Sequence, residues 1–526
     1  MTLLHIENLS LSISGTPILK DISFSLEEGR ILGVIGESGS GKSMTAFAIM
    51  QLMPSGASTT GQLLVDGLDT LNASENELCK MRGNDVSIVF QEPMTALNPL
   101  KNIGEQVAEC IMIHEPQTPR GEALNRARSA LERCELPESR FPLSLYPHEL
   151  SGGQRQRVVI ALAIALRPKL LIADEPTTAL DVTTQAEILT LLRRLVQEDG
   201  MGLLLITHDL AVVADMADDI VIMKDGEIVE SGDTAFVFQR MQHPYTRALY
   251  EASGHIPERT PTQSMSPILS VKEVVRDYRL PRKKLFAAPE HFRAVDGASF
   301  EIFKGESLGL VGESGCGKST LTRAILGLEA VQGGEIRLND APIGPGHTMG
   351  PEIRSKMQAV FQDPYGSFNP RHRVDRLISE PLHLLDSPPA GSERSDVISN
   401  ALREVGLSAE DQFKYIHEFS GGQRQRIAIA RALIIQPDLI LLDEATSALD
   451  VSIRAQILDL LAELAASHGL TYLFISHDLS VVRSITDRVL VMKSGKIVEE
   501  GATDQVLSQP KNEYTKTLID AAPMLP

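Results

Sequence analysis

Short apolar runs that end in glycine-rich loops recur along this chain, and polar, helix-forming segments separate them. ILGVIG and SLGLVG each enter such a loop, and apolar positions at helical spacing follow. Two further continuous apolar runs, LLIADE and LILLDE, end in a pair of acids. Continuous apolar runs are typical of parallel strands buried on both faces. The pattern predicts an α/β fold in which strand, loop and helix units surround a parallel sheet.

The whole pattern occurs twice in the same order. GESGSGKS returns as GESGCGKS, and LSGGQRQRV returns as FSGGQRQRI. Between the copies lies a segment with three prolines among serine, threonine and glycine, which is linker composition. We therefore expect a first domain at 1–253, a linker at 254–267 and a second domain at 268–526. The second copy also has a basic insertion around Arg282, which predicts a longer hairpin.

The glycine loops have the spacing G-x-x-x-x-G-K-S, in which successive backbone N–H groups surround phosphate oxygens and the lysine reaches the β- and γ-phosphates. The serine that follows the lysine usually binds Mg²⁺ through its hydroxyl. The two loops predict ATP sites and consist of Gly36, Glu37, Ser38, Gly39, Ser40, Gly41, Lys42 and Ser43, and of Gly312, Glu313, Ser314, Gly315, Cys316, Gly317, Lys318 and Ser319.

Acidic pairs at the ends of apolar strands provide the expected catalytic groups. In P-loop hydrolases the first acid helps to hold Mg²⁺, which assigns that role to Asp174 and Asp443. A neighbouring group positions or deprotonates the attacking water. Glu175 and Glu444 are the predicted catalytic bases. A histidine follows the next apolar run in each half, His208 and His477, and its equivalent position in both copies makes it a further candidate.

Composition limits the function of the chain. Its 526 residues include 50 Lys and Arg against 69 Asp and Glu, a net charge of −19 that would repel nucleic acid at long range. No apolar run approaches the roughly 18 to 20 residues of a membrane helix, and the beginning of the chain lacks a signal-peptide pattern. The four cysteines form no C-x-x-C pair. We expect a cytosolic location.

On these residues the chain resembles two ABC-transporter ATPase halves fused in tandem. The segments SGGQ resemble the ABC signature, FQ resembles the Q-loop, and the two histidines resemble the switch histidine. The resemblance implies an α/β RecA-like core in each half, with an antiparallel β subdomain and a helical subdomain. It adds nucleotide contacts from Gln91 and Gln362, which also approach Mg²⁺, from Ser151, Gly152, Gly153 and Gln154, and from Ser420, Gly421, Gly422 and Gln423.

The same resemblance implies head-to-tail pairing, in which each phosphate loop faces the signature of the other half and one chain supplies both sites. Members of the family usually stack an aromatic residue on adenine. Tyr278 matches that residue, and Ile13 stands at the corresponding first-half position. We therefore expect unequal nucleotide affinities.

FQEPMTALNP, FQDPYGSFNP, YPHELSGG and HPYTRAL are similar to segments of the peptide/nickel importer ATPases, and the layout is most similar to the microcin-type peptide group. This resemblance implies an ATPase docked on the cytoplasmic face of two integral membrane permeases, with a separate solute-binding protein outside. Peptides are the expected cargo, while nickel, opines and glutathione remain alternatives. Permease loops are expected on the helical subdomains, roughly 97–150 and 368–419.

Two other classes of function remain in view. Soluble tandem ABC proteins that act on ribosomes have a similar length and two complete sites, but a long charged helical linker joins their halves, whereas this chain has a short Pro-rich joint. A regulatory module that binds ATP without hydrolysing it is the second alternative. The presence of both glutamates and both histidines speaks against it.

Overall fold

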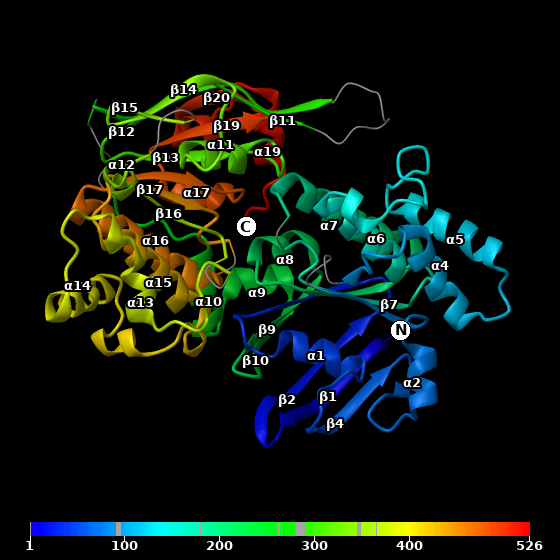
Figure 1. Cartoon of the computed structure of the whole chain (residues 1–526). Helices are drawn as coiled ribbons and strands as arrows, with labels where there is room; N and C mark the ends of the chain where they lie inside the picture. The colour runs from blue at the N-terminus through cyan, green and yellow to red at the C-terminus, as the bar shows by residue number, and fades with distance from the viewer. Residues whose placement is uncertain are drawn as a thin grey trace. The chain divides into compact units, whose positions relative to one another are not determined.

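A computed structural model describes residues 2–90, 96–178, 180–259, 264, 266–279, 290–344, 349–363, 366–447 and 449–525. The chain forms two compact units, the first made of 1–180, 184–253 and 523–526 and the second of 181–183 and 254–522. The main division falls between Ser253 and Gly254. How far the linker and the two functional domains extend stays a prediction. Figure 1 shows the elements of each unit.

Two sheets organise the first unit. An antiparallel sheet has the order β2-β1-β4-β5, and a larger sheet has the order β10-β9-β3-β8-β7-β6, parallel except for β10. The strands are β1 (Thr2–Ile13), β2 (Thr16–Glu27), β3 (Ile31–Ile35), β4 (Ala57–Val65), β5 (Leu68–Asp69), β6 (Val86–Val89), β7 (Leu170–Asp174), β8 (Gly202–Ile206), β9 (Asp219–Lys224) and β10 (Glu227–Asp233).

Helices cover the parallel sheet of the first unit, and α4 and α5 pack on each other and on α6. The helical segments are α1 (Lys42–Ile49), α2 (Glu75–Met81), α4 (Ile103–His114), α5 (Arg120–Arg133), the 3₁₀ turn η1 (Pro147–Glu149), α6 (Gly152–Ala163), α7 (Val182–Asp199), α8 (Leu210–Met216), α9 (Thr234–Arg240) and α10 (Pro244–Ser253).

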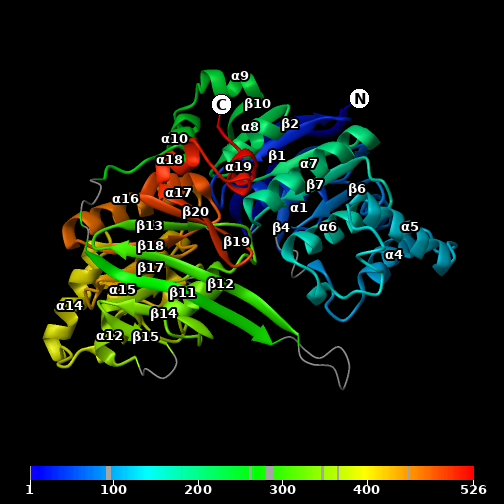
Figure 2. The same ribbon diagram turned by 90° about the horizontal axis from the view of Figure 1, so that it is seen from above.

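The second unit repeats this plan, with an antiparallel sheet β12-β11-β14-β15 and a larger sheet β16-β17-β18-β13-β19-β20. Figure 2 shows the long β11 and β12 ribbon. The strands are β11 (Pro267–Arg279), β12 (His291–Phe303), β13 (Ser307–Val311), β14 (Gly333–Leu338), β15 (Ala341–Ile343), β16 (Met357–Val360), β17 (Leu439–Asp443), β18 (Thr471–Ile475), β19 (Arg488–Lys493) and β20 (Lys496–Ala502).

The helices of the second unit likewise include a group between β16 and β17. They are α11 (Lys318–Ile325), α12 (Pro351–Lys356), α13 (Val374–Ile378), η2 (Glu380–Leu384), α14 (Gly391–Glu404), η3 (Ala409–Phe413), η4 (Ile416–Glu418), α15 (Gly421–Leu433), α16 (Val451–His468), α17 (Leu479–Ile485), α18 (Thr503–Ser508) and α19 (Glu513–Asp520).

The central strands are buried on both faces, as their apolar runs predict. In β7, Leu170 and Ile172 belong to one hydrophobic cluster, whereas Leu171 and Ala173 belong to another. Alternate residues of a strand point to opposite faces, so each face of the sheet has its own core. The predicted α/β class with an antiparallel subdomain and a helical subdomain in each half is confirmed.

The sequence also predicts a long hairpin in the second half and no membrane-spanning helix. The long hairpin is present as the pairing of β11 with β12, which extends to Arg279 opposite His291, while Arg282 lies outside the described residues. Among the helices that the structure describes, none is long and apolar enough to cross a membrane.

Candidate functional site

Each phosphate loop leaves the end of a fully buried strand through a glycine that no other residue can replace. Gly36 follows β3 with φ +156°, and a Cβ there would lie 2.2 Å from the carbonyl oxygen of Met223. Gly312 follows β13 with φ +151°, and its Cβ would lie 2.2 Å from the carbonyl oxygen of Met492. Both contacts are far too short, so the turn that opens the loop requires glycine.

The loop lysines are held inside the loops by backbone oxygens. Lys42 is 6 % exposed, and its Nζ donates hydrogen bonds to the carbonyl oxygens of Gly36 (2.7 Å) and Glu37 (3.0 Å). Lys318 makes the same two bonds to Gly312 (2.6 Å) and Glu313 (2.9 Å). A buried ammonium group needs such hydrogen-bond partners. The phosphate oxygens of a bound nucleotide would compete with these carbonyl oxygens for the lysine. Helices α1 and α11 begin at these lysines, so their N-termini also face the loops.

A tyrosine that the sequence analysis did not assign supports each loop. Glu37 N donates a hydrogen bond to Tyr245 Oη (3.1 Å), and Glu313 N donates one to Tyr514 Oη (3.0 Å). Both tyrosines are nearly buried, at 9 % and 6 % exposure. Tyr245 belongs to HPYTRAL, which served above only as a family marker, and Tyr514 belongs to the related segment NEYTKTL. The recurrence of a tyrosine in both copies was the available signal.

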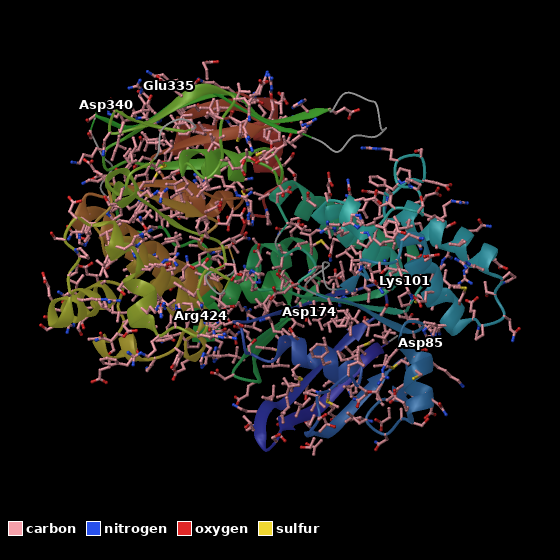
Figure 3. All side chains as sticks on the ribbon, viewed as in Figure 1. Asp85, Lys101, Asp174, Glu335, Asp340 and Arg424 are labelled. Atoms are coloured by element: carbon pink, nitrogen blue, oxygen red, sulfur yellow. The ribbon has the colours of Figure 1, made fainter. Side chains whose placement is uncertain are left out.

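The acids at the ends of β7 and β17 lie near the loop lysines, Lys42 and Lys318. Figure 3 labels Asp174, whose carboxyl is hydrogen-bonded to the side chain of Ser43. Burial raises the pKa of Asp174, and Ser43 and Lys42 offset only part of this effect. Burial together with the charge of Glu444 likewise raises the pKa of Asp443.

One oxygen of the Asp174 carboxylate has no partner. Asp174 Oδ1 is buried, and no described residue gives it a hydrogen bond. A buried carboxylate oxygen beside a serine hydroxyl is the kind of hard oxygen ligand that Mg²⁺ prefers. These residues therefore fit the predicted cation.

The next residue in each half takes a left-handed backbone conformation that is uncommon for glutamate. Glu175 has φ +48° and Glu444 has φ +50°. In each half the backbone N–H donates to the last residue of the neighbouring strand, Ile206 O at 2.8 Å and Ile475 O at 2.9 Å. The carboxylate of each glutamate lies close to the histidine that follows in the chain.

The predicted catalytic pairs come together in both halves. His208 Nδ1 lies 3.4 Å from Glu175 Oε1, and His477 Nδ1 lies 3.3 Å from Glu444 Oε1. Burial raises the pKa of each glutamate, but the hydrogen bond and charge of the histidine outweigh burial, so the net pKa is lowered. Carboxylates with a lowered pKa stay ionised near neutral pH and retain the lone pairs that a catalytic base needs.

The SGGQ segments form helix N-termini. Ser151 Oγ accepts a hydrogen bond from Gln154 N (3.3 Å), and Gln154 Oε1 accepts one from Ser151 N (2.9 Å). Ser420 and Gln423 form the same reciprocal cap, with distances of 3.4 Å and 3.0 Å. Both serines and the first glycines, Gly152 and Gly421, are exposed. Exposed N–H and hydroxyl groups at a helix start suit a phosphate.

The second glycine of each signature has a packing role. A Cβ on Gly153 would lie 2.2 Å from Thr184 Cγ2, and one on Gly422 would lie 2.4 Å from Ile453 Cγ2. Glycine therefore lets the helix that begins at the SGGQ segment approach the helix that follows the strand-end acids. The predicted pairing of each signature with the opposite phosphate loop stays a prediction.

One of the two predicted Q-loop glutamines, Gln362, belongs to the described residues. Gln362 is exposed and follows β16, which pairs with the strand that ends in Asp443. Gln91 lies outside the described residues.

The predicted adenine contact, Tyr278, belongs to a polar network. Its hydroxyl donates to Glu329, and the Arg276 guanidinium lies 4.6 Å from its ring centroid. Arg276 Nε also lies 3.1 Å from Glu329 Oε2. One face of the ring is therefore covered by arginine, and the hydroxyl is fixed by the glutamate. The strand register places Ile13 at the equivalent position.

Two ATP-type loops, two strand-end acids and two glutamate–histidine pairs define a P-loop ATPase with duplicated sites. Comparison with known proteins agrees with this class. Residues 19–178 and 295–447 match the ABC transporter family. Residues 229–271 and 498–526 match the oligopeptide/dipeptide transporter C-terminal region.

Two relatives align with nearly the whole chain. The peptidoglycan transport ATP-binding protein YejF of Agrobacterium fabrum is 44% identical, over 99% of this chain and 96% of that protein. The glutathione import ATP-binding protein GsiA of Escherichia coli O157:H7 is also 44% identical, over 99% of this chain and 89% of that protein. A dimeric ATP-binding cassette solved in a post-hydrolysis state with ADP and phosphate is 28% identical, covers 45% of this chain and 98% of that chain, and has a TM-score of 0.40.

The chain belongs to the ABC transporter family, as a tandem ATP-binding protein of its oligopeptide/dipeptide transporter group. It is the ATPase subunit of a binding-protein-dependent ABC importer and couples ATP hydrolysis to import. The predicted family and the predicted enzyme class are confirmed.

Proposed function

We propose that this ATPase energises the import of peptides or peptide-like compounds, including small thiol peptides such as glutathione. The observation that supports this most directly is the oligopeptide/dipeptide C-terminal region, which occurs at the end of both halves. Relatives that cover nearly the whole chain are named for peptidoglycan transport and glutathione import, two solutes with peptide character. The microcin-type layout and cargo belong to the same proposal.

Two ATP sites are proposed, each built from both halves. In each, the phosphate loop holds the phosphates and the signature of the other half approaches the γ-phosphate. The first site is composed of Lys42, Ser43, Gln91, Asp174, Glu175 and His208 with Ser420 and Gly422. The second is composed of Lys318, Ser319, Gln362, Asp443, Glu444 and His477 with Ser151 and Gly153.

Mg²⁺ is the proposed cation of both sites. Ser43 and Asp174 would hold it in the first half, and Ser319 and Asp443 in the second. The cation neutralises charge on the β- and γ-phosphates when it is bound. The partnerless Asp174 Oδ1 beside Ser43 supports this assignment.

Hydrolysis is proposed to follow from the glutamate–histidine pairs. The lowered pKa of Glu175 and of Glu444 keeps each carboxylate ionised, so it accepts a proton from the attacking water. The histidine 3.3 to 3.4 Å away holds the carboxylate in one orientation. The lysine donates to the phosphate oxygens on which negative charge accumulates.

The proposed partners are two integral membrane permeases, on whose cytoplasmic face the chain docks peripherally, and a separate solute-binding protein on the other side. The helical segments around α4 and α5 and around α13 and α14 provide docking surfaces, because each lies between a Q-loop and a signature in sequence. Nucleic acid is not a proposed partner, given the net charge of −19.

The test is to extract the native complex from membranes in mild detergent and to identify the bound proteins by mass spectrometry. Two multi-span permeases are expected. After reconstitution in vesicles with the matching solute-binding protein, a peptide or glutathione should stimulate ATP hydrolysis, whereas a nickel complex or an opine should not. Recovery of ribosomal proteins in place of permeases would overturn the proposal.

A further inference from the structure

A cavity of about 500 Å³ lies in the first unit, between α8 and α9 (Figure 1). It adjoins the beginning of the central strand β3, because its lining residue Asp218 accepts a hydrogen bond through Oδ2 from Ile31 N at 2.8 Å. The phosphate loop leaves the other end of this strand, so the cavity lies away from that loop. Among the described residues, the charged side chains that line it are Arg30, Asp218 and Asp233. We call this site the aspartate cavity.

The second unit has the same backbone frame around Asp487. Asp487 Oδ2 accepts a hydrogen bond from Ser307 N at 2.9 Å, as Asp218 Oδ2 does from Ile31 N. The reverse bonds also match, since Asp487 N donates to Ser307 O at 2.8 Å and Asp218 N donates to Ile31 O at 2.9 Å. The two aspartates therefore hold equivalent positions, and each uses Oδ2 for its bond to the strand.

A guanidinium group of the chain itself contacts the aspartate of the second unit. Arg259 Nη2 lies 3.4 Å from Asp487 Oδ1, and the two side chains are only 19 % and 18 % exposed. Burial lowers the pKa of Arg259, and the negative charges of Asp487 and Asp504 offset part of this effect. Two carboxylates therefore lie near one guanidinium group in the second unit.

The first unit also has two carboxylates at this place, and neither forms an ion pair with a residue that the structure describes. Asp218 is exposed, and the second carboxylate belongs to Asp233, whose Oδ1 accepts a hydrogen bond from Phe236 N at 3.0 Å. Within the described part of the chain, no group donates a hydrogen bond to Asp218 Oδ1 or to Asp233 Oδ2. Arg30, the one described cation in the lining, is paired with Asp219 at 3.1 Å.

A buried hydroxyl group in the lining of the cavity also lacks a partner. Thr234 is 5 % exposed, and no described residue forms a hydrogen bond with its Oγ1. In the second unit the equivalent Thr503 Oγ1 lies 2.8 Å from Thr486 Oγ1. Ala217 takes the place of Thr486 in the first unit and lines the cavity. The smaller side chain therefore leaves room in the wall and an oxygen without a hydrogen-bond donor.

The negative charge around the aspartate cavity exceeds what Arg30 compensates. Burial raises the pKa of Asp219, and Arg30 offsets only part of this effect. The charges of Asp218, Asp233 and Glu27 raise the pKa of Asp219 further. A cation in the cavity would relieve the repulsion among these carboxylates.

We propose that the aspartate cavity binds a guanidinium group, carried by an arginine side chain of a polypeptide segment or by a small guanidinium compound. The N–H groups of the ligand donate to Asp218 and Asp233, and the ring of Phe238 lines the apolar side of the cavity. The pairing of Arg259 with Asp487 in the second unit is the pattern for this contact. The inference does not depend on the proposed function, because it rests on the comparison of the two units.

A metal ion is the less favoured occupant of the aspartate cavity. Arg30 lines the cavity and would repel a metal ion, and the nearby carboxylate of Asp219 is already paired with this arginine. In the described part of the chain, no group of three or more His, Cys, Asp or Glu side chains is arranged to hold a metal ion. A guanidinium group spreads its charge over several N–H donors and so matches two carboxylates that come from separate elements.

The test measures binding of the peptide HIPERTP, the sequence of residues 255–261, to the full chain by saturation-transfer NMR, which detects weak binding. Matched peptides carry citrulline or lysine in place of the arginine, and citrulline keeps the shape of arginine without its charge. Methylguanidinium and Mg²⁺ are the competing probes. ATP binding and basal ATPase activity are measured on the same samples.

Three variants locate the peptide. The cavity variant combines Asp218→Asn with Asp233→Asn, which keeps an acceptor oxygen for the backbone bond of each side chain. The matched control combines Asp225→Asn with Glu251→Gln, two exposed acids of the same unit that do not line the cavity. Asp487→Asn reports on the second unit.

The arginine peptide should bind the natural chain and the control alike, and the cavity variant should lose at least about tenfold in affinity. Asp233→Asn alone should lose a smaller part of the affinity, and it replaces the double variant if that chain does not fold. ATP binding and basal ATPase activity should be unchanged. Competition by methylguanidinium would show that a small compound is sufficient, whereas binding that resists it would assign the cavity to an arginine within a segment.

Four results would overturn the inference. The first is equal peptide binding by the cavity variant and the natural chain, and the second is equal binding of the citrulline or lysine peptide. The third is loss of binding through Asp487→Asn with the cavity variant unaffected, which would place the peptide on the second unit. The fourth is displacement of the peptide by Mg²⁺ in preference to methylguanidinium, which would identify a metal site.

Discussion

In both halves the loop lysine donates to two carbonyl oxygens of its own loop, a tyrosine accepts from the loop backbone, and a histidine lies beside the predicted catalytic glutamate. The surroundings of the expected base-binding positions are different. In the second half they are polar and charged, with Arg276, Tyr278, Thr320, Arg323 and Glu329. At the equivalent positions the first half has Leu11, Ile13, Met44, Phe47 and Met53.

Different interactions stabilise these two sets of residues. Tyr278 and Glu329 are joined by a hydrogen bond, and Arg276 and Arg323 both pair with Glu329. In the first half Leu11 belongs to the hydrophobic cluster of the antiparallel sheet, and Ile13, Met44 and Met53 pack against that cluster. The ring of Phe47 lies 6.3 Å from that of Phe90. Hydrolysis needs every group that contacts the phosphates, whereas contacts with adenine contribute mainly to the affinity for ATP. The residues expected near adenine are therefore the ones that can differ between two duplicated sites.

A salt bridge near the beginning of the central strand illustrates the same freedom. Arg30 pairs with Asp219 at 3.1 Å in the first half, and Glu306 pairs with Arg488 at 2.9 Å in the second. The two positions have exchanged their charges. Both halves have an ion pair at these positions, although the residue types differ. Loss of one partner would leave a partly buried charge uncompensated.

The strongest test of equivalence between the two sites replaces the catalytic glutamates. Glu175→Gln together with Glu444→Gln should reduce ATP hydrolysis by about 10² to 10⁴, because the amide cannot accept the proton of the attacking water. ATP binding should persist. Steady-state phosphate release from the purified chain measures the effect, and each single variant shows how much its half contributes. Turnover that survives the double substitution would remove these residues from the mechanism.

Exchanging the base-side residues tests the main difference between the halves. Tyr278→Ile should weaken ATP binding at the second site by about tenfold, because base stacking contributes about 1 to 3 kcal/mol. Ile13→Tyr should strengthen the first site. Titration with a fluorescent ATP analogue resolves each site when the other is disabled through Lys42→Ala or Lys318→Ala. Tyr278→Phe keeps the ring and is the control. Equal affinities at the two natural sites would contradict the comparison.

The loop-supporting tyrosines should behave alike in both halves, which makes them a check on what is shared. Tyr245→Phe or Tyr514→Phe removes the oxygen that accepts from Glu37 N or Glu313 N and preserves the ring. Loss of one such hydrogen bond costs about 1 kcal/mol, which corresponds to about fivefold weaker ATP binding. We expect KM for ATP to rise more than kcat falls. Tyr250→Phe, on the same helix as Tyr245, is the control. A fall in kcat with KM unchanged would exclude a role in holding the loop.

The sequence was sufficient to predict the groups whose chemistry fixes both residue type and spacing. The lysine, the strand-end acids and the SGGQ caps are local patterns, so their positions could be assigned without coordinates. The bond from Glu37 to Tyr245 joins residues far apart in the chain, and only the fold brings them together. The hollow lined by Arg371, Arg394 and Phe413 likewise combines three separate segments. Long-range contacts of this kind leave no periodic signal in a single sequence.

The smallest expected difference concerns the charge state of the histidine in the second half. Burial lowers the pKa of His477, but Glu444 and Asp478 more than compensate, so the net pKa is raised above 6.5. Asp478 is in turn paired with Arg454 at 2.9 Å, where the first half has Gln185.

The sign of the pH dependence follows from this shift. A pKa raised by folding gives a stabilising interaction that is complete below the unfolded value of about 6.5 and is lost as the pH rises through the folded value. His477→Gln should therefore lower the unfolding temperature of the second unit more at pH 6 than at pH 9, as measured by calorimetry. Glu444→Gln removes the partner and should shrink the same pH dependence. A difference that grows with pH would mean that His477 is neutral in the folded protein and that Glu444 is held by another group.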